Sequence, residues 1–246
     1  MATKHDSSGP FERQARAALA ESAESLRRVE RECASAVAAA SEILIHCFEN
    51  GGTVYFCGNG GSAADAQHLA AEFQGRYLVD RPALPAVALT TNTSSITAIG
   101  NDYGYDQVFS RQLEGLGMPG DVLVAVSTSG KSESILRAIF TARSLAMTVI
   151  GMTGGRGAEF ADLCDVALVT PHLLTPRVQE GHIAMGHAVC LLVEHALFPP
   201  PAKKPSKPAK GKATAKSAAK ASVKATAKSN KAPKRAAKPR AKGRRA

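Results

Sequence analysis

Short apolar runs alternate with helical stretches through most of this chain, and this alternation constrains the fold more than any other feature. The apolar runs, which predict strands, lie at 53–57, 85–90, 121–127, 148–153 and 166–170. The remaining stretches predict helices at 62–77, 93–116 (broken at 100–104), 132–146, 158–164 and 175–198. Strands that are apolar on both faces and alternate with helices form a parallel sheet that is covered on both sides. We therefore predict an α/β fold with a five-stranded parallel, flavodoxin-like sheet.

The segment before the first strand predicts helix. Residues 12–49 are rich in Ala, Leu, Glu and Arg and contain neither Gly nor Pro, so helix is favoured throughout. The charged residues 30–32 predict a break between two helices, and the sequence Asn-Gly-Gly at 50–52 predicts a stop. Residues 1–198 therefore form one domain, with N-terminal helices at 12–49 and an α/β body at 53–198.

The composition changes at residue 199, where three prolines begin a basic tail at 199–246. Residues 203–246 hold 17 of the 31 Lys and Arg residues and no Asp or Glu, which leaves 14 basic against 21 acidic residues before them, a net charge of −7. Such a tail cannot bury enough apolar surface to fold, so we predict disorder. It resembles the Lys/Ala/Pro tails of linker-histone-like proteins, and we expect it to bind nucleic acid through phosphates, without sequence selectivity. A solvated tail and a contact with the acidic domain are the alternatives.

The chain carries no pattern typical of export or membrane insertion. The N-terminus is polar, and no stretch approaches the ~20 apolar residues that span a bilayer. The five cysteines are odd in number, widely spaced and without a C-x-x-C pair, which is typical of reduced thiols. We predict a cytoplasmic protein with no membrane partner.

A glycine-rich turn, CGNGGS at 57–62, joins the first predicted strand to a helix. Glycines let the backbone approach an anion, and a helix N-terminus offers free N–H groups and a positive dipole. Ser62 is placed to cap the helix or to bind a ligand through its hydroxyl. The turn has neither the GxGxxG spacing nor a Walker lysine, so a nucleotide site is disfavoured. A tight connection without a ligand is the alternative.

A second turn, STSGKS at 127–132, follows the third predicted strand. Its four hydroxyls and its backbone N–H groups can form a phosphate cradle, whereas capping the next helix would need only one hydroxyl. Ligands of parallel sheets bind at the carboxyl ends of the strands. Both turns lie at such ends, so phosphate binding is favoured.

Two pairs of residues supply nitrogen and oxygen donors. His68 and Glu72 are one helical turn apart, and they could be metal ligands, or Glu72 could be a base. Gln179 and His187 are two turns apart on the last helix and differ by about 80° around its axis, so both can reach one cleft. Each pair alone is weak evidence. Together with the two turns, the pairs predict an enzyme that acts on a small phosphorylated polyol or sugar.

The motifs together resemble one known family. GNGGSAADAQH at 58–68, GRY at 75–77, AIGND at 98–102, STSGKS at 127–132 and RVQEGH at 177–182 occur in the order typical of the sugar isomerase (SIS) fold. Over about residues 12–198 the chain resembles the phosphoheptose isomerases of lipopolysaccharide heptose synthesis. The resemblance implies a homotetramer that converts sedoheptulose 7-phosphate to D-glycero-D-manno-heptose 7-phosphate through an enediol. Nothing in the family corresponds to the tail.

The resemblance also implies roles for individual residues. One zinc ion per subunit would be bound by His68, Glu72, Gln179 and His187. The substrate phosphate would be bound by Ser127, Thr128, Ser129 and Ser132. The sugar would be contacted by Asn59, Gly60, Gly61, Ser62, Glu72, Arg76, Asp102 and Gln179. Glu72 would be the general base for the carbon proton, and His187 the acid and base for the oxygens.

Two other functions share part of this pattern. A non-enzymatic SIS protein that binds the bacterial replication initiator lacks the acid at the Glu72 position and the histidine at the His187 position. A SIS sugar-phosphate sensor would need only the phosphate turns. This chain has both Glu72 and His187, so an enzyme is favoured. The chain departs from the family at 172–176, HLLTP, where members often carry an acidic residue ahead of Arg177. Any role of that acid must be supplied otherwise in this chain.

Overall fold

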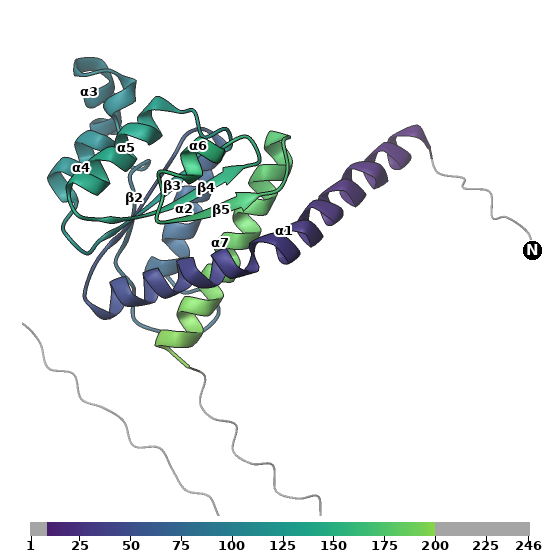
Figure 1. The fold of residues 1–246 in the computed structure, drawn as a ribbon, viewed down its shortest axis with the longest axis horizontal. Helices are drawn as coiled ribbons and strands as arrows, with labels where there is room; N and C mark the ends of the chain where they lie inside the picture. Colours follow the sequence, from purple (N-terminus) through teal and green to yellow (C-terminus); the bar gives the residue numbers. More distant parts are fainter. Residues whose placement is uncertain (1–8, 200–246) are drawn as a thin grey trace, which may run out of the picture. The chain divides into compact units, whose positions relative to one another are not determined.

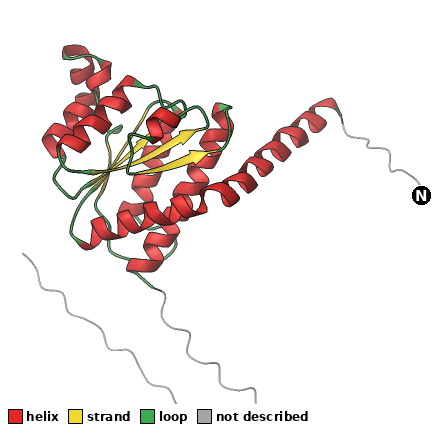
Figure 2. Ribbon diagram, viewed as in Figure 1, coloured by secondary structure: helices red, strands yellow, loops and turns green. Residues whose placement is uncertain are grey.

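The computed structural model describes residues 9–199 and contains one parallel sheet between two layers of helices (Figures 1 and 2). The strands are β1 (Val54–Gly58), β2 (Ala86–Ala88), β3 (Val122–Val126), β4 (Thr148–Gly154) and β5 (Val166–Thr170). They lie in the order β2-β1-β3-β4-β5, and every pairing is parallel. The predicted fold class is confirmed. The predicted tail lies outside the described residues from residue 200 onward.

Each face of the sheet has its own apolar core. The helices are α1 (Pro10–Glu49), α2 (Gly61–Gln74), α3 (Thr93–Asp102), α4 (Ser110–Leu116), α5 (Glu133–Ser144), α6 (Ala158–Ala161) and α7 (Thr175–Leu197), with a 3-10 turn η1 at Tyr105–Gln107. Helices α1, α2 and α7 pack on one face, and α4, α5 and α6 pack on the other. No helix among the described residues is long and apolar enough to cross a membrane.

Helix α1 runs without interruption, so the predicted break at 30–32 is wrong. Val29, Cys33 and Val37 are buried at a spacing of four residues, and this stripe continues along one face through the charged run. The Arg28 Nε atom lies 3.0 Å from Glu32 Oε1, a spacing that supports helix. The N-terminal half of α1 extends away from the sheet (Figure 1).

Helix α6 ends at Ala161, three residues before its predicted end, and three further differences occur at a glycine or proline. Helix α2 ends at Gln74, three residues early, because Gly75 follows it. Strand β2 has three residues, of which Ala86 is the first after Pro85. The break predicted at 100–104 occurs at the end of that range, because α3 continues to Asp102 and Gly104 has a φ of +100°.

Candidate active site

Two turns meet at the carboxyl edge of the sheet. Strands β1 and β3 are neighbours, and Gly58 pairs with Val126, so the turns that follow them begin at the same level. The Asn59 Nδ2 atom donates to Ser132 Oγ at 2.8 Å and to Ser134 Oγ at 2.9 Å. These two bonds join the glycine-rich turn to the end of the serine-rich turn and to the first turn of α5.

The glycine-rich turn brings α2 against the start of α7. Gly60 is the N-cap residue of α2 and has a φ of +54°, a value that favours glycine. A Cβ atom on Gly61 would overlap the Gln179 side-chain amide, so a larger residue at this position would displace that amide. Ser62 is buried in the first helical turn, and the prediction that it caps the helix is wrong.

The serine-rich turn arranges its hydroxyls around the backbone. Ser127 Oγ accepts from the Gly130 N–H at 3.1 Å, and Ser129 Oγ accepts from the Lys131 N–H at 3.3 Å. Ser132 is the N-cap residue of α5, but its hydroxyl caps no N–H group of the described helix. The hydroxyl of Ser132 instead accepts from Asn59, so it faces the other turn.

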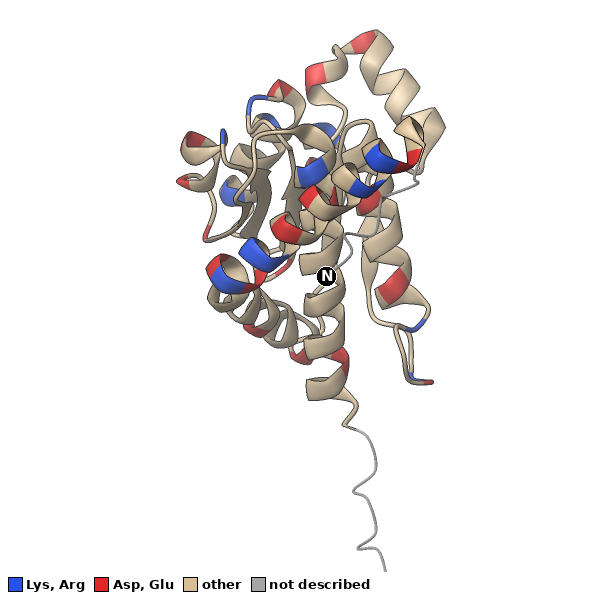
Figure 3. Cartoon of the chain, turned by 90° about the vertical axis from the view of Figure 1, so that its right-hand side faces the viewer, with Lys and Arg blue, Asp and Glu red and all other residues tan. Residues whose placement is uncertain are grey.

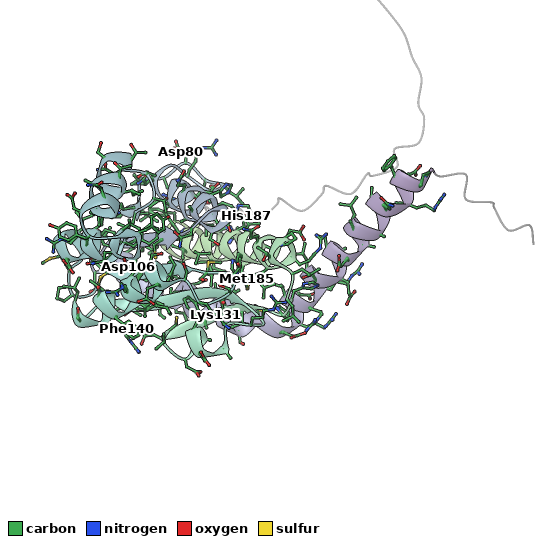
Figure 4. The ribbon with its side chains drawn as sticks, turned by 90° about the horizontal axis from the view of Figure 1, so that it is seen from above. Asp80, Asp106, Lys131, Phe140, Met185 and His187 are labelled. Atoms are coloured by element: carbon green, nitrogen blue, oxygen red, sulfur yellow. The ribbon has the colours of Figure 1, made fainter. Side chains whose placement is uncertain are left out.

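Three side chains of types that can bind a metal converge where α2 faces α7. His68 Nε2 lies 2.8 Å from His187 Nε2 and 3.4 Å from Glu72 Oε1. One donor atom from each of these three residues lies within 4.8 Å of the others. Figure 4 labels His187 and Met185 on α7; Met185 is buried in the core, whereas His187 is half-buried beside α2.

A glycine sets the separation of the two helices at this point. A Cβ atom on Gly186 would lie 2.6 Å from Leu69 Cδ2. Leu69 follows His68 on α2, and Gly186 precedes His187 on α7. The absence of a side chain at Gly186 therefore lets the two imidazoles meet.

An open cleft of about 440 Å³ lies beside the histidine pair, lined by Ala64, Asp65, His68, Pro176, Gln179, Glu180 and Ile183. His68 and Gln179 thus share one cleft. Asp65, which the sequence interpretation did not single out, has a buried Oδ2 atom without a hydrogen-bond partner among the described residues. Burial raises the pKa of Asp65, and the nearby His68 opposes this effect.

The donor set fits a divalent metal such as zinc. Imidazole nitrogens and carboxylate oxygens are ordinary zinc ligands, and catalytic sites use three protein ligands and keep a position open. Two Nε2 atoms at 2.8 Å can share one proton as a hydrogen bond, or they can both offer lone pairs to a cation. Gln179 would supply a fourth, weaker donor.

Among the described residues, two predicted sugar contacts make local hydrogen bonds. Arg76 is exposed after α2 and donates to the Leu78 carbonyl at 3.3 Å. Asp102 is exposed at the end of α3 and accepts from Asn101 at 2.7 Å. Their roles stay predictions.

An acidic residue does reach the start of α7, but from α1. Glu21 Oε2 lies 3.3 Å from Arg177 Nε, and Glu21 Oε1 lies 3.9 Å from His172 Nε2. Ser22 donates to Glu180 at 2.7 Å, and Arg177 also contacts Glu180. Because Glu21 is 156 residues from Arg177, no local pattern in the sequence could have found it.

The comparisons with known proteins indicate one family. The SIS domain family model matches residues 19–154. A phosphoheptose isomerase from Rhodospirillum rubrum is 56% identical over 166 residues, which cover 68% of this chain and 88% of the relative. A solved phosphoheptose isomerase from Neisseria gonorrhoeae is 44% identical with a TM-score of 0.71, covering 75% of this chain and 98% of that one. Another from Francisella tularensis is 34% identical with a TM-score of 0.73, covering 76% and 100%.

Proposed function

This chain belongs to the SIS domain family and is a sugar-phosphate isomerase of the phosphoheptose isomerase type, and we propose that it converts sedoheptulose 7-phosphate to D-glycero-D-manno-heptose 7-phosphate. One observation carries the proposal: the Glu72 carboxylate and the His187 imidazole, from two distant helices, lie in one cluster. The two turns to which we assign the substrate follow neighbouring strands at the carboxyl edge of the sheet. A replication-initiator-binding protein or a sensor would not need that cluster.

The residues of the cluster match the proton transfers that the reaction needs. Moving the carbonyl from C2 to C1 requires that a proton leave C1 and that one be added at C2. We assign this transfer to Glu72, which takes the C1 proton and returns it at C2. His187 donates a proton to O2 as the enediol forms and takes one from O1 as the aldehyde forms, so protons balance over the cycle.

His68 and Gln179 complete a set of four candidate metal ligands with Glu72 and His187. A zinc ion held by this set would supply Lewis-acid stabilisation of the negative charge that develops on the substrate oxygens. Glu72 and His187 are assigned both as metal ligands and as proton-transfer groups. Each side chain must therefore shift between holding the ion and moving a proton.

The substrate phosphate is assigned to the serine-rich turn. Ser127, Thr128, Ser129 and Ser132 offer hydroxyls and backbone N–H groups to the phosphate. Asn59 links this turn to the glycine-rich turn, so phosphate binding and sugar binding would be coupled through one side chain.

The direct test uses protein that has been stripped with a chelator and then restored with Zn²⁺. We expect restored protein, but not stripped protein, to form an aldoheptose phosphate from sedoheptulose 7-phosphate, measured by NMR or mass spectrometry after chromatography. Sedoheptulose without its phosphate serves as a control and should react poorly. No product with zinc present would refute the proposed reaction, and full turnover in the stripped protein would refute the metal.

We also propose that the chain assembles as a homotetramer. The protruding half of α1 exposes large apolar side chains, with Phe11 85% and Leu19 70% accessible, and a second copy would cover them. The Phe11→Glu, Leu19→Glu double variant should have a smaller mass by light scattering than the unchanged chain. An unchanged tetramer would place the interface elsewhere.

A second proposed activity belongs to the tail, which lies outside the described residues. Its 17 positive charges without an acid favour contact with nucleic acid phosphates, with affinity that falls steeply as salt rises. It contains no aromatic residue, so selective stacking on single strands is not expected.

A further inference from the structure

A buried ion pair lies behind the candidate active site. Glu194 of α7 and Arg81 of the segment after α2 approach at 3.1 Å (Oε2 to Nε), and each side chain is 1% exposed. Burying such a pair is seldom a net gain in stability, because apolar side chains of the same volume do as well or better. A gain in stability therefore does not explain this ion pair. The other contacts of Glu194 and Arg81 indicate a different role.

Glu194 captures three consecutive backbone N–H groups. Its carboxylate accepts from Tyr77 at 3.0 Å, Leu78 at 2.8 Å and Val79 at 2.9 Å. Burial alone would raise the pKa of Glu194, but these donors and Arg81 hold it below its usual value. An ionised carboxylate thus fixes the path of the chain after α2.

Arg81 caps the end of α2. Its guanidinium donates to the carbonyls of Glu72 and Phe73, both at 2.8 Å, and to that of Pro82 at 3.0 Å. Carbonyls in the last turn of a helix lack partners within the helix. The ring of Phe198 covers the guanidinium, 5.6 Å from its centroid.

Both ends of this network reach the cluster. Glu72 carries the clustered carboxylate, and its own backbone carbonyl is held by Arg81. Tyr77, whose N–H is held by Glu194, has its ring 5.6 Å from the His187 ring. His187 and Glu194 are seven residues apart, two turns of α7, so they lie on nearly the same side of that helix.

We propose that the Glu194–Arg81 pair positions the active site, by fixing Glu72 and Tyr77 against His187 on α7. Neither residue touches the reacting atoms, so both are positioning residues. The inference rests on the proposed function for its effect on turnover, whereas its effect on the segment after α2 does not depend on that function.

The test compares Glu194→Gln with Glu114→Gln, a matched control whose carboxylate pairs with Arg111 at the surface. In Glu194→Gln we expect amide hydrogen exchange at residues 77–79 to rise about tenfold or more, and Zn²⁺ affinity of the stripped protein to fall. Loss of residues that orient ligands typically costs about 10- to 100-fold in affinity or activity. We expect kcat to fall by that factor while KM changes by less than about threefold. The control should match the unchanged chain in all three measurements.

A second variant guards against simple unfolding of the first. The Glu194→Leu, Arg81→Met double variant removes both charges at similar volume, so it should fold, and it should still lose kcat, zinc affinity and protection at 77–79. A folded double variant with normal kcat and zinc affinity would overturn the inference, as would unchanged exchange in Glu194→Gln. If the unchanged chain fails to isomerise the heptose, the proposed function falls, and exchange and zinc affinity still decide the positioning role.

Discussion

Two roles are assigned to the single side chain of Glu72, because its carboxylate is both a candidate metal ligand and the candidate base. Glu72→Gln keeps the size and removes the proton acceptor. Loss of a positioned base costs about 10²- to 10⁴-fold, so we expect kcat to fall at least that far, with an unchanged circular dichroism spectrum. Glu42→Gln, an exposed change on α1, is the control. Turnover near that of the control would remove Glu72 as the base.

His182 should make the fold sensitive to acid. It is fully buried, and neither ring nitrogen has a hydrogen-bond partner among the described residues. Burial lowers its pKa from 6.5 to about 4, and the nearby backbone of Thr153 opposes this effect. Between these two values the unfolded chain binds more protons than the native one, so stability is full above pH 6.5 and is lost as pH falls toward 4.

This difference in proton binding corresponds to about 3 kcal/mol in the free energy of unfolding between pH 7 and pH 4. Urea unfolding across that range should show the loss, and His182→Leu should remove this contribution. His46→Gln, an exposed histidine change, should keep it. An equal slope in the His182 variant would assign the acid sensitivity to other groups.

The sequence indicated the residues that stand in dense motifs and missed those that act across long distances. His68, Glu72 and His187 could be singled out because helical spacing and residue type point to a shared cleft. Glu194 could not, because a carboxylate in a helix looks the same whether it faces solvent or captures three N–H groups. Its partners were only identifiable once α7 lay beside the end of α2.

At the scale of elements, the contact between α2 and α7 depends on one missing side chain. Gly186→Ala should push Leu69 aside or separate the helices, since the new Cβ would lie 2.6 Å from Leu69 Cδ2. Overpacking costs about 1–3 kcal/mol, and alanine gains about 1 kcal/mol of helix preference, so stability should fall by no more than about 2 kcal/mol. Misplacing reacting groups by about 1 Å can cost 10²-fold in rate, so kcat should fall far more than stability.

A compensating change sharpens this test. Leu69→Ala in the Gly186→Ala background removes the clashing atoms, and we expect kcat to recover in part. Leu69→Ala alone leaves a cavity and should cost about 2–5 kcal/mol of stability. Steady-state kinetics and urea unfolding of the three variants would decide the matter, and an active Gly186→Ala single variant would show that the spacing is not critical.

Apolar runs predicted all five strands because a strand buried on both faces needs apolar residues at every position, as in β1 and β3. Helix bounds were less predictable, since they depend on partners. The charged residues 30–32 suggested a break in α1, but the buried stripe beneath them continues toward α7 and β5. Packing against distant elements keeps α1 continuous through residues 30–32, and no local sequence pattern indicates that packing.

At the scale of the whole chain, charge separates the tail from the rest. In the described part, basic and acidic residues are interspersed along the helices (Figure 3), whereas residues 203–246 are basic without exception among their charged residues. Deleting residues 203–246 should leave kcat and KM unchanged, because every assigned site residue lies before Pro199. A large loss of turnover would show that the tail takes part in catalysis.

The same deletion should abolish retention of the protein on immobilised duplex DNA at low salt. With the tail present, retention should fall steeply as salt rises, because each neutralised phosphate releases counterions. Binding that persists after deletion would place the contact on the folded domain instead.

Helix α1 has a mechanical consequence for the proposed assembly. Its free end projects outward, and Glu21, further along the same helix, touches Arg177, two residues from Gln179. A neighbouring subunit that binds the projecting end would therefore also restrain Arg177, and with it the start of α7 beside the cleft. Specific activity per subunit should then decline on dilution, because the oligomer dissociates.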